Sequence, residues 1–190
     1  MNLKNEYNRI TEALVAEHVQ VFKAQNLNEV KELMDAIIAA KRIFALGAGR
    51  EGIATRAFAM RLSHLGKETH WIWDDTTPGM GKGDLLIMSS GSGKIGHIHY
   101  IAEQAKKTGA SLAIVTGTPK EMTPALADVV LFIPACVFNG TDARCIPSIQ
   151  PMGSLYEQHL FLLYDTIVLM LESEMNLSHE EMEARHRNVE

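Results

Sequence analysis

Two short glycine-rich segments of the chain could bind an anion. The first, Gly47-Ala48-Gly49-Arg50-Glu51-Gly52, matches the pattern G-x-G-x-x-G between an apolar run and a helical pattern. Glycine allows a tight turn and a close approach of the backbone, and the start of a helix favours a negative charge. Because Asp74 ends the next apolar run, a nicotinamide dinucleotide also fits this pattern, as does a turn that merely requires glycine.

The second segment, Ser90-Gly91-Ser92-Gly93, also stands between an apolar run and a helical pattern. Its hydroxyls and its backbone amides suit a compact phosphate group. A dinucleotide site has no need of this second segment, whereas a small phosphorylated ligand would use both segments. Ordinary turn chemistry remains the alternative interpretation of the two serines.

A carboxylate near the end of the chain has two open interpretations. Ser154-x-x-Glu157 is a capping-box pattern that would begin the apolar helix from Leu160 to Leu171. A carboxylate at a helix start beside a ligand crevice could also act as a general base that removes a proton next to a carbonyl.

The elements that would position these residues follow from the alternation of periods along the chain. Strands are predicted from Arg42 to Leu46, Thr69 to Trp73, Asp84 to Ser89, Ser111 to Thr116 and Val129 to Ile133. Helical patterns stand before, between and after them, and Thr118-Pro119-Lys120-Glu121 has the residues of a helix start. This alternation predicts a three-layer α/β fold with a five-stranded parallel sheet. If the strand order is 2-1-3-4-5, both glycine segments face one crevice.

Composition limits the classes of protein that this chain can be. Its 190 residues are 46% hydrophobic and 22% charged, which indicates one globular domain and excludes a disordered chain. A net charge of −5 argues against a nucleic-acid partner, and no stretch is long and apolar enough to predict a membrane segment. Two cysteines, Cys136 and Cys145, do not make a disulfide framework, so inert thiols in the cytoplasm are expected. His97 and His99 would lie about 200° apart on a helix, so no metal site is expected there.

Several segments together carry a resemblance to a known family. They are Gly47–Arg50, Arg56–Leu62, Gly83–Ile87, Ser90–Gly93, Ile149–Gln158 and, in the tail, Glu181-Met182 with Arg185-His186, Asn188 and Glu190. From about residue 10 to the end, the chain resembles the sugar isomerase (SIS) domain family and is most similar to its 6-phospho-3-hexuloisomerases.

The resemblance implies a fold and a reaction. It implies a single SIS domain over residues 1–190, with N-terminal helices over about 1–40 and a C-terminal helical tail over about 152–190. The sheet would be flavodoxin-like, with the order 2-1-3-4-5. The reaction would convert 3-hexulose 6-phosphate into fructose 6-phosphate through an enediolate, without a metal or an organic cofactor. The chain would form a homo-oligomer, with a tetramer expected.

The resemblance also implies site residues. Glu157 matches the family's base, and His186 matches a catalytic residue that reaches the site of a neighbouring subunit. The implied substrate-binding residues are Gly47, Gly49, Arg50, Glu51, Ser90, Gly91, Ser92, Gly93 and Lys94.

Three positions depart from the family pattern, and the first two of them support a second hypothesis. Glu51 stands where the family typically has Ser, Ile95 stands where it typically has Thr, and Lys94 stands where it often has an acid. At ~4 Å and an effective dielectric near 20, a carboxylate repels a unit negative charge by about 4 kcal/mol. We therefore expect Glu51 to pair with Lys94, which would leave the phosphate to backbone amides, Ser90 and Ser92. The alternative is an SIS-fold sugar-phosphate-binding protein with altered or lost catalysis, and a nicotinamide-dependent enzyme comes third.

Overall fold

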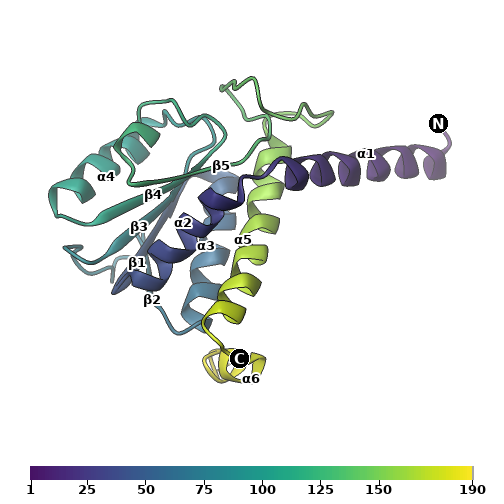
Figure 1. The fold of residues 1–190 in the computed structure, drawn as a ribbon. Coiled ribbons are helices and arrows are strands. Elements are labelled where there is room, and N and C mark those ends of the chain that lie inside the picture. The colour runs from purple at the N-terminus through teal and green to yellow at the C-terminus, as the bar shows by residue number, and fades with distance from the viewer. Residues whose placement is uncertain (190) are drawn as a thin grey trace.

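The computed structural model describes residues 1–189, so residue 190, the last of the expected domain and of the tail motif, lies outside the described residues. The strands are β1 (Arg42–Gly47), β2 (Glu68–Trp71), β3 (Leu85–Ser89), β4 (Ser111–Thr116) and β5 (Val129–Phe132) (Figure 1). The helices are α1 (Leu3–Ala24), α2 (Leu27–Ala39), α3 (Gly49–His64), α4 (Gly96–Lys107), α5 (Ser154–Glu174) and α6 (His179–Ala184). All five predicted strands are confirmed, with bounds that differ by at most two residues.

The five strands form one parallel sheet in the order β2-β1-β3-β4-β5, which confirms the predicted fold class. Side chains alternate between the two faces of each strand. Ile43 and Ile87 pack in the core with α2, α3 and α5, whereas Phe44 and Leu86 pack against α4. The three layers are visible in Figure 1, where α4 lies on one side of the sheet and α3 and α5 lie on the other.

The helix predicted after β4 is wrong. The segment Thr118-Pro119-Lys120-Glu121 forms a turn, in which the amide of Glu121 donates to the carbonyl of Thr118, and a short 3-10 helix follows at Pro124–Leu126. The Thr118 hydroxyl donates to the Gly91 carbonyl at 2.9 Å, so it does not cap a helix. The expected capping residue therefore holds the second glycine segment in place.

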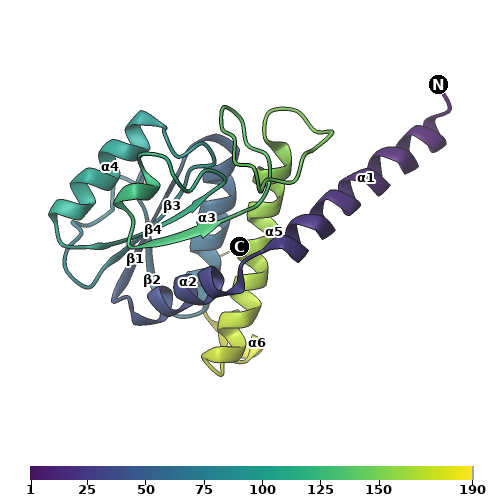
Figure 2. The same cartoon turned by 45° about the horizontal axis from the view of Figure 1, so that its top comes forward.

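Helix α1 extends away from the rest of the molecule (Figures 1 and 2). Glu17 and Val21, in its second half, are its buried residues, and His18 and Phe22 of this half contact His159 of α5. In the described part of the chain, no helix is both long enough and apolar enough to cross a membrane.

Candidate functional site

The two glycine segments meet at the carboxyl edge of the sheet, as predicted. Gly47 ends β1 and stands in register with Ser89, which ends the neighbouring β3. A Cβ atom at Gly47 would lie 2.5 Å from Ser89 Oγ and 2.8 Å from the Gly52 Cα atom. Glycine at 47 and 52 is thus required for α3 to start directly against the end of β3. This contact brings Glu51, in the first turn of α3, to the second segment.

Glu157 is not part of a capping box, so that interpretation is wrong. Helix α5 begins at Ser154, and its N-cap is Gly153, which has a φ of 78° and no side chain to cap the helix. The Ser154 hydroxyl donates to the Pro151 carbonyl. The Glu157 carboxylate instead accepts a hydrogen bond from Arg50 Nε at 2.6 Å. A carboxylate from α5 and a guanidinium from the first glycine segment therefore stand together at the edge of the sheet.

The expected ion pair between Glu51 and Lys94 is also wrong. Glu51 Oε2 accepts a hydrogen bond from the Gly91 amide at 2.9 Å, and the Lys94 ammonium lies 3.8 Å from the carboxylate of Glu121. The physical reason is the backbone: the Gly91 amide points at the start of α3, whereas Lys94 extends toward the turn after β4. Burial raises the pKa of Glu51 to about 7, against the effect of the Gly91 hydrogen bond and with a further rise from the Glu157 charge.

Hydrogen bonds to the Gly91 carbonyl anchor the second glycine segment, and one hydroxyl of the segment has no partner in the described protein. The hydroxyls of Thr116 and Thr118 both donate to the Gly91 carbonyl. Ser90 is fully buried, and its Oγ has no hydrogen-bond partner in the described protein. Ser92, which is partly buried, precedes the first turn of α4. The segment therefore holds one buried hydroxyl, that of Ser90, that is not already used within the described residues.

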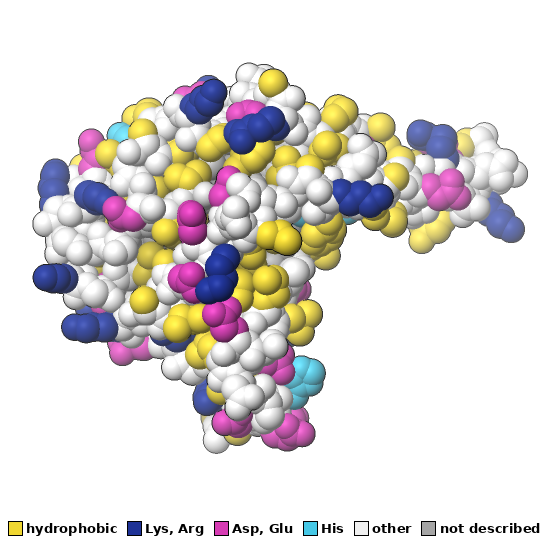
Figure 3. All heavy atoms as spheres, in the orientation of Figure 1, with side chains coloured by type: hydrophobic (Ala, Val, Ile, Leu, Met, Phe, Trp, Pro, Cys, Tyr) yellow, Lys and Arg dark blue, Asp and Glu magenta, His cyan; other side chains and the backbone are white. Residues whose placement is uncertain are grey.

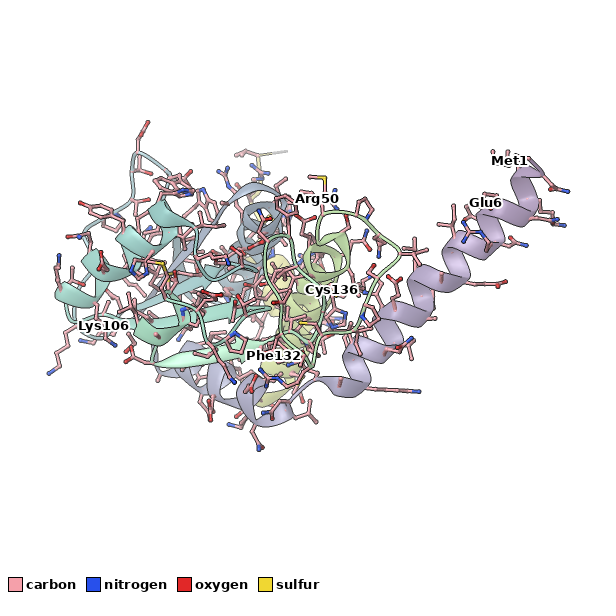
Figure 4. All side chains as sticks on the ribbon, turned by 90° about the horizontal axis from the view of Figure 1, so that it is seen from above. Met1, Glu6, Arg50, Lys106, Phe132 and Cys136 are labelled. Atoms are coloured by element: carbon pink, nitrogen blue, oxygen red, sulfur yellow. The ribbon has the colours of Figure 1, made fainter. Side chains whose placement is uncertain are left out.

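Two pockets of similar size border the first glycine segment. One, of about 450 Å³, is lined by Arg50 and Glu157 with the apolar Phe161 and Leu162. The other, of about 500 Å³, includes Gly47 and Gly49 and is bordered by Trp71, Trp73 and His97. Figure 4 looks onto this edge and places Arg50 beside the first turn of α5, near the segment that carries Cys136. A ligand of sugar-phosphate size would fit along this edge.

His186 lies far from Glu157 in the same chain. Glu157 is in the first turn of α5, a helix of 21 residues that is about 30 Å long. Helix α6 lies at the other end of α5 (Figure 1). His186 follows α6 and lines a separate pocket of about 990 Å³. There its ring centroid lies 5.3 Å from that of His64. One chain therefore does not bring the two expected catalytic residues together.

The structure adds positioning residues that the sequence analysis missed. Buried Glu17 of α1 accepts hydrogen bonds from the Ser148 hydroxyl and the Ile149 amide, both at 2.7 Å. A signal was present, because Glu17 stands three residues after Leu14 and four before Val21, which places a carboxylate on the apolar stripe of α1. Thr116 and Thr118, which hold Gly91, carried no such signal.

Two of the other residues considered show no sign of a role at the site. Asp74, the acid expected in a dinucleotide site, forms an ion pair with Arg56 at 3.2 Å. Burial raises the pKa of the Cys145 thiol to about 11, as suits an inert thiol. Within residues 1–189, no group of three or more His, Cys, Asp or Glu residues could hold a metal ion.

Comparisons with known proteins agree on one family. The SIS domain model matches residues 36–158. The 3-hexulose-6-phosphate isomerase of Bacillus subtilis (strain 168) is 36% identical over 162 residues, which cover 85% of this chain and 87% of that protein. The enzyme of the same name from Mycobacterium gastri is 40% identical over 85% of this chain and 80% of its own length. A solved structure from Methanococcus jannaschii, from which the molecular function of 3-hexulose-6-phosphate isomerase was inferred, has a TM-score of 0.83 at 27% identity and covers 96% of this chain and 99% of its own.

Proposed function

Since the chain belongs to the SIS domain family, we propose that it is an isomerase of a phosphorylated ketohexose that converts 3-hexulose 6-phosphate into fructose 6-phosphate. The observation that carries the proposal is the Glu157 carboxylate, held by Arg50 at the edge where both glycine segments end. Its side chain is 18% exposed, so it is accessible to a ligand and still shielded from bulk water.

Glu157 is proposed to move the proton between two adjacent carbons. The substrate has its carbonyl at C3 and the product has it at C2. The carboxylate takes the proton from C2, which gives an enediolate with its charge on O3. The hydroxyl proton then passes from O2 to O3, and the protonated carboxyl returns the first proton to C3, which leaves the carbonyl at C2. Arg50 stands beside this carboxylate and is 62% exposed, so its guanidinium can also turn toward the enediolate oxygens and stabilise their charge.

The phosphate is proposed to bind at the second glycine segment. The unpartnered Ser90 hydroxyl, Ser92 and the first turn of α4 offer hydrogen-bond donors there. Gly47, Gly49, Gly91 and Gly93 shape the surrounding backbone, and Lys94 adds a positive charge at its rim.

A second candidate function is a sugar-phosphate-binding protein without catalysis. The observation that favours it is the hydrogen bond between Glu51 and the Gly91 amide, which places a carboxyl group where a phosphate would find a donor.

We further propose that the chain works as a homo-oligomer, with a tetramer expected, in which His186 reaches the site of a neighbouring subunit. The exposed apolar side chains of α1 support assembly. Residues 1–190 are proposed to act as one SIS domain, whose flanking helices extend beyond the matched range of 36–158. Its expected location in the cytoplasm stays a prediction.

Exchange of a carbon-bound proton of the sugar with solvent tests both candidate functions. Fructose 6-phosphate is incubated with the protein in heavy water, and proton NMR follows C3. An isomerase that passes through the enediolate exchanges the C3 proton for deuterium, and Glu157→Gln abolishes the exchange. Binding without exchange would support the binding protein, and the absence of both would reject this substrate.

A further inference from the structure

Glu51 is a carboxyl group in the candidate site without a cationic partner. Its Oε2 accepts from the Gly91 amide at 2.9 Å. The two cations of the glycine segments have other partners, since Arg50 pairs with Glu157 and Lys94 pairs with Glu121. Among the ion pairs of residues 1–189, none neutralises Glu51.

The surroundings of Glu51 disfavour its charged form. The Cβ position of Gly91 lies 2.9 Å from Glu51 Oε1 and 3.1 Å from the ring of Tyr156, so the carboxyl group is enclosed between the second segment and α5. The titratable groups that act on it from α5 are Glu157, Tyr156 and Tyr164. None of these three groups can supply a positive charge.

A bound phosphate group would further disfavour the charged form of Glu51. The hydroxyl of Ser90 and the start of α4 lie in the segment whose Gly91 amide Glu51 already occupies. A phosphate monoester carries close to two negative charges at neutral pH, and a nearby charge of the same sign favours the neutral form of a carboxyl group. A neutral carboxyl group, in contrast, has one oxygen to accept from Gly91 and one O–H to donate.

We propose that Glu51 takes up a proton from solvent when a phosphorylated ligand binds and then, as a neutral acid, accepts from the Gly91 amide while it donates to a phosphate oxygen. The inference rests on the proposed function in that a sugar phosphate is the ligand of this site. It makes Glu51 a binding residue where a carboxylate would otherwise repel the ligand, and it couples affinity to pH.

Calorimetric titration with fructose 6-phosphate at about pH 8, in two buffers with different ionisation enthalpies, measures the protons taken up. For the wild type we expect close to one proton per site and an affinity that falls nearly tenfold per pH unit above neutrality. In Glu51→Gln, the amide can accept from Gly91 and donate to phosphate without a proton. This variant should show no uptake, an affinity independent of pH and, at about pH 8, binding about tenfold tighter than the wild type.

Glu121→Gln is the matched control. It removes the exposed carboxylate that pairs with Lys94 beside the same segment, so it can alter affinity but should leave the proton uptake intact. Binding of fructose 6-phosphate by the wild type without proton uptake, and with the pH dependence of Glu51→Gln, would overturn the role of Glu51. If neither protein binds this sugar, inorganic phosphate is titrated in its place. Proton-linked binding of phosphate would support the role of Glu51 and reject only the hexose, whereas no binding of either probe would overturn both proposals.

Discussion

Glu157 is available for proton transfer because its carboxylate does not cap helix α5. Because Gly153 is the N-cap of α5, the Glu157 carboxylate has no role in the start of the helix and meets Arg50. The same side chain that a sequence pattern would assign to helix stability is therefore available for proton transfer.

Glu157→Gln should lower turnover of 3-hexulose 6-phosphate by roughly 10²–10⁴, the range expected for loss of a general base. The melting temperature should change little, because Arg50 is largely exposed and an exposed ion pair adds little stability. A coupled assay for fructose 6-phosphate and a thermal melt measure the two effects. Glu103→Gln, on the exposed side of α4, is the control, and full activity of Glu157→Gln would remove Glu157 as the base.

The raised pKa of Glu51 predicts that the stability of the fold depends on pH. Burial, aided by the Glu157 charge, raises its folded pKa from 4.5 to about 7. Below pH 4.5 the Glu51 carboxyl group is protonated in both the folded and the unfolded chain, so its contribution to the free energy of unfolding is fully present. This contribution is lost as the pH rises through about 7, because the unfolded chain releases the proton first. At about 1.4 kcal/mol per unit of pKa, the loss is at most on the order of 3.5 kcal/mol.

Glu51→Gln should therefore gain free energy of unfolding relative to the wild type as pH rises from 4.5 to 7, with a constant difference above that range. Urea denaturation at a series of pH values measures this difference. Parallel curves for the two proteins would show that Glu51 ionises normally in the folded chain.

At the scale of elements, α1 holds the segment that leads into α5. Glu17 accepts from the Ser148 hydroxyl, the Ile149 backbone amide and the side-chain amide of Gln150, and these three residues precede Gly153 and the first turn of α5. Burial opposes the ionisation of Glu17, but these hydrogen bonds outweigh it, so the pKa of Glu17 lies below its usual value. Helix α1 thus helps to position Glu157 through the segment that precedes α5.

Glu17→Gln should destabilise the fold by about 1–3 kcal/mol, since hydrogen bonds to a charged group are weakened and one donor faces the new amide. Turnover should fall as well, because the segment before α5 loses its anchor. Chemical denaturation and steady-state kinetics measure both. Glu12→Gln, on the exposed side of the same helix, should alter neither, and unchanged kinetics in Glu17→Gln would separate α1 from the site.

At the scale of the molecule, α1 presents apolar side chains that the single chain does not cover. Leu3, Tyr7, Val15 and Val19 are between 43% and 74% exposed, and Leu169 of α5 is 61% exposed. Hydrophobic side chains follow α1 and continue where it meets α5 (Figure 3). Apolar surface of this extent is typical of an interface.

Light scattering should show a tetramer, or at least a dimer, at micromolar concentration, and Val15→Asp with Val19→Asp should reduce the assembly. If His186 acts across subunits, mixing inactive Glu157→Gln and His186→Ala chains after unfolding should restore about a quarter of the activity, because mixed oligomers contain intact sites. Each variant refolded alone is the control. If the wild type is a monomer, or if the mixtures have no activity, His186 does not act in the site of a neighbouring subunit.

The sequence alone was sufficient for the five strands and for the glycine segments that follow two of them, because strand periodicity and glycines at strand ends are local signals. Whether the two segments meet depends on the strand order 2-1-3-4-5, which the sheet has and which places Gly47 in register with Ser89. Carboxylates at 51 and 157 could also be identified as chemical groups from sequence alone.

Only the tertiary structure decided the partners of these groups. Thr118 and Ser154 have the residue types of helix caps, yet Thr118 bonds to Gly91 and α5 is capped by Gly153. Glu51 pairs with an amide and Lys94 with Glu121, although opposite charges suggested a pair. A side chain bonds to whatever the fold brings within about 3 Å, and these distances depend on segments far apart in the sequence. Residue types therefore set which reactions are possible, and the packing of α1, α3 and α5 against the sheet decides which of them the site can perform.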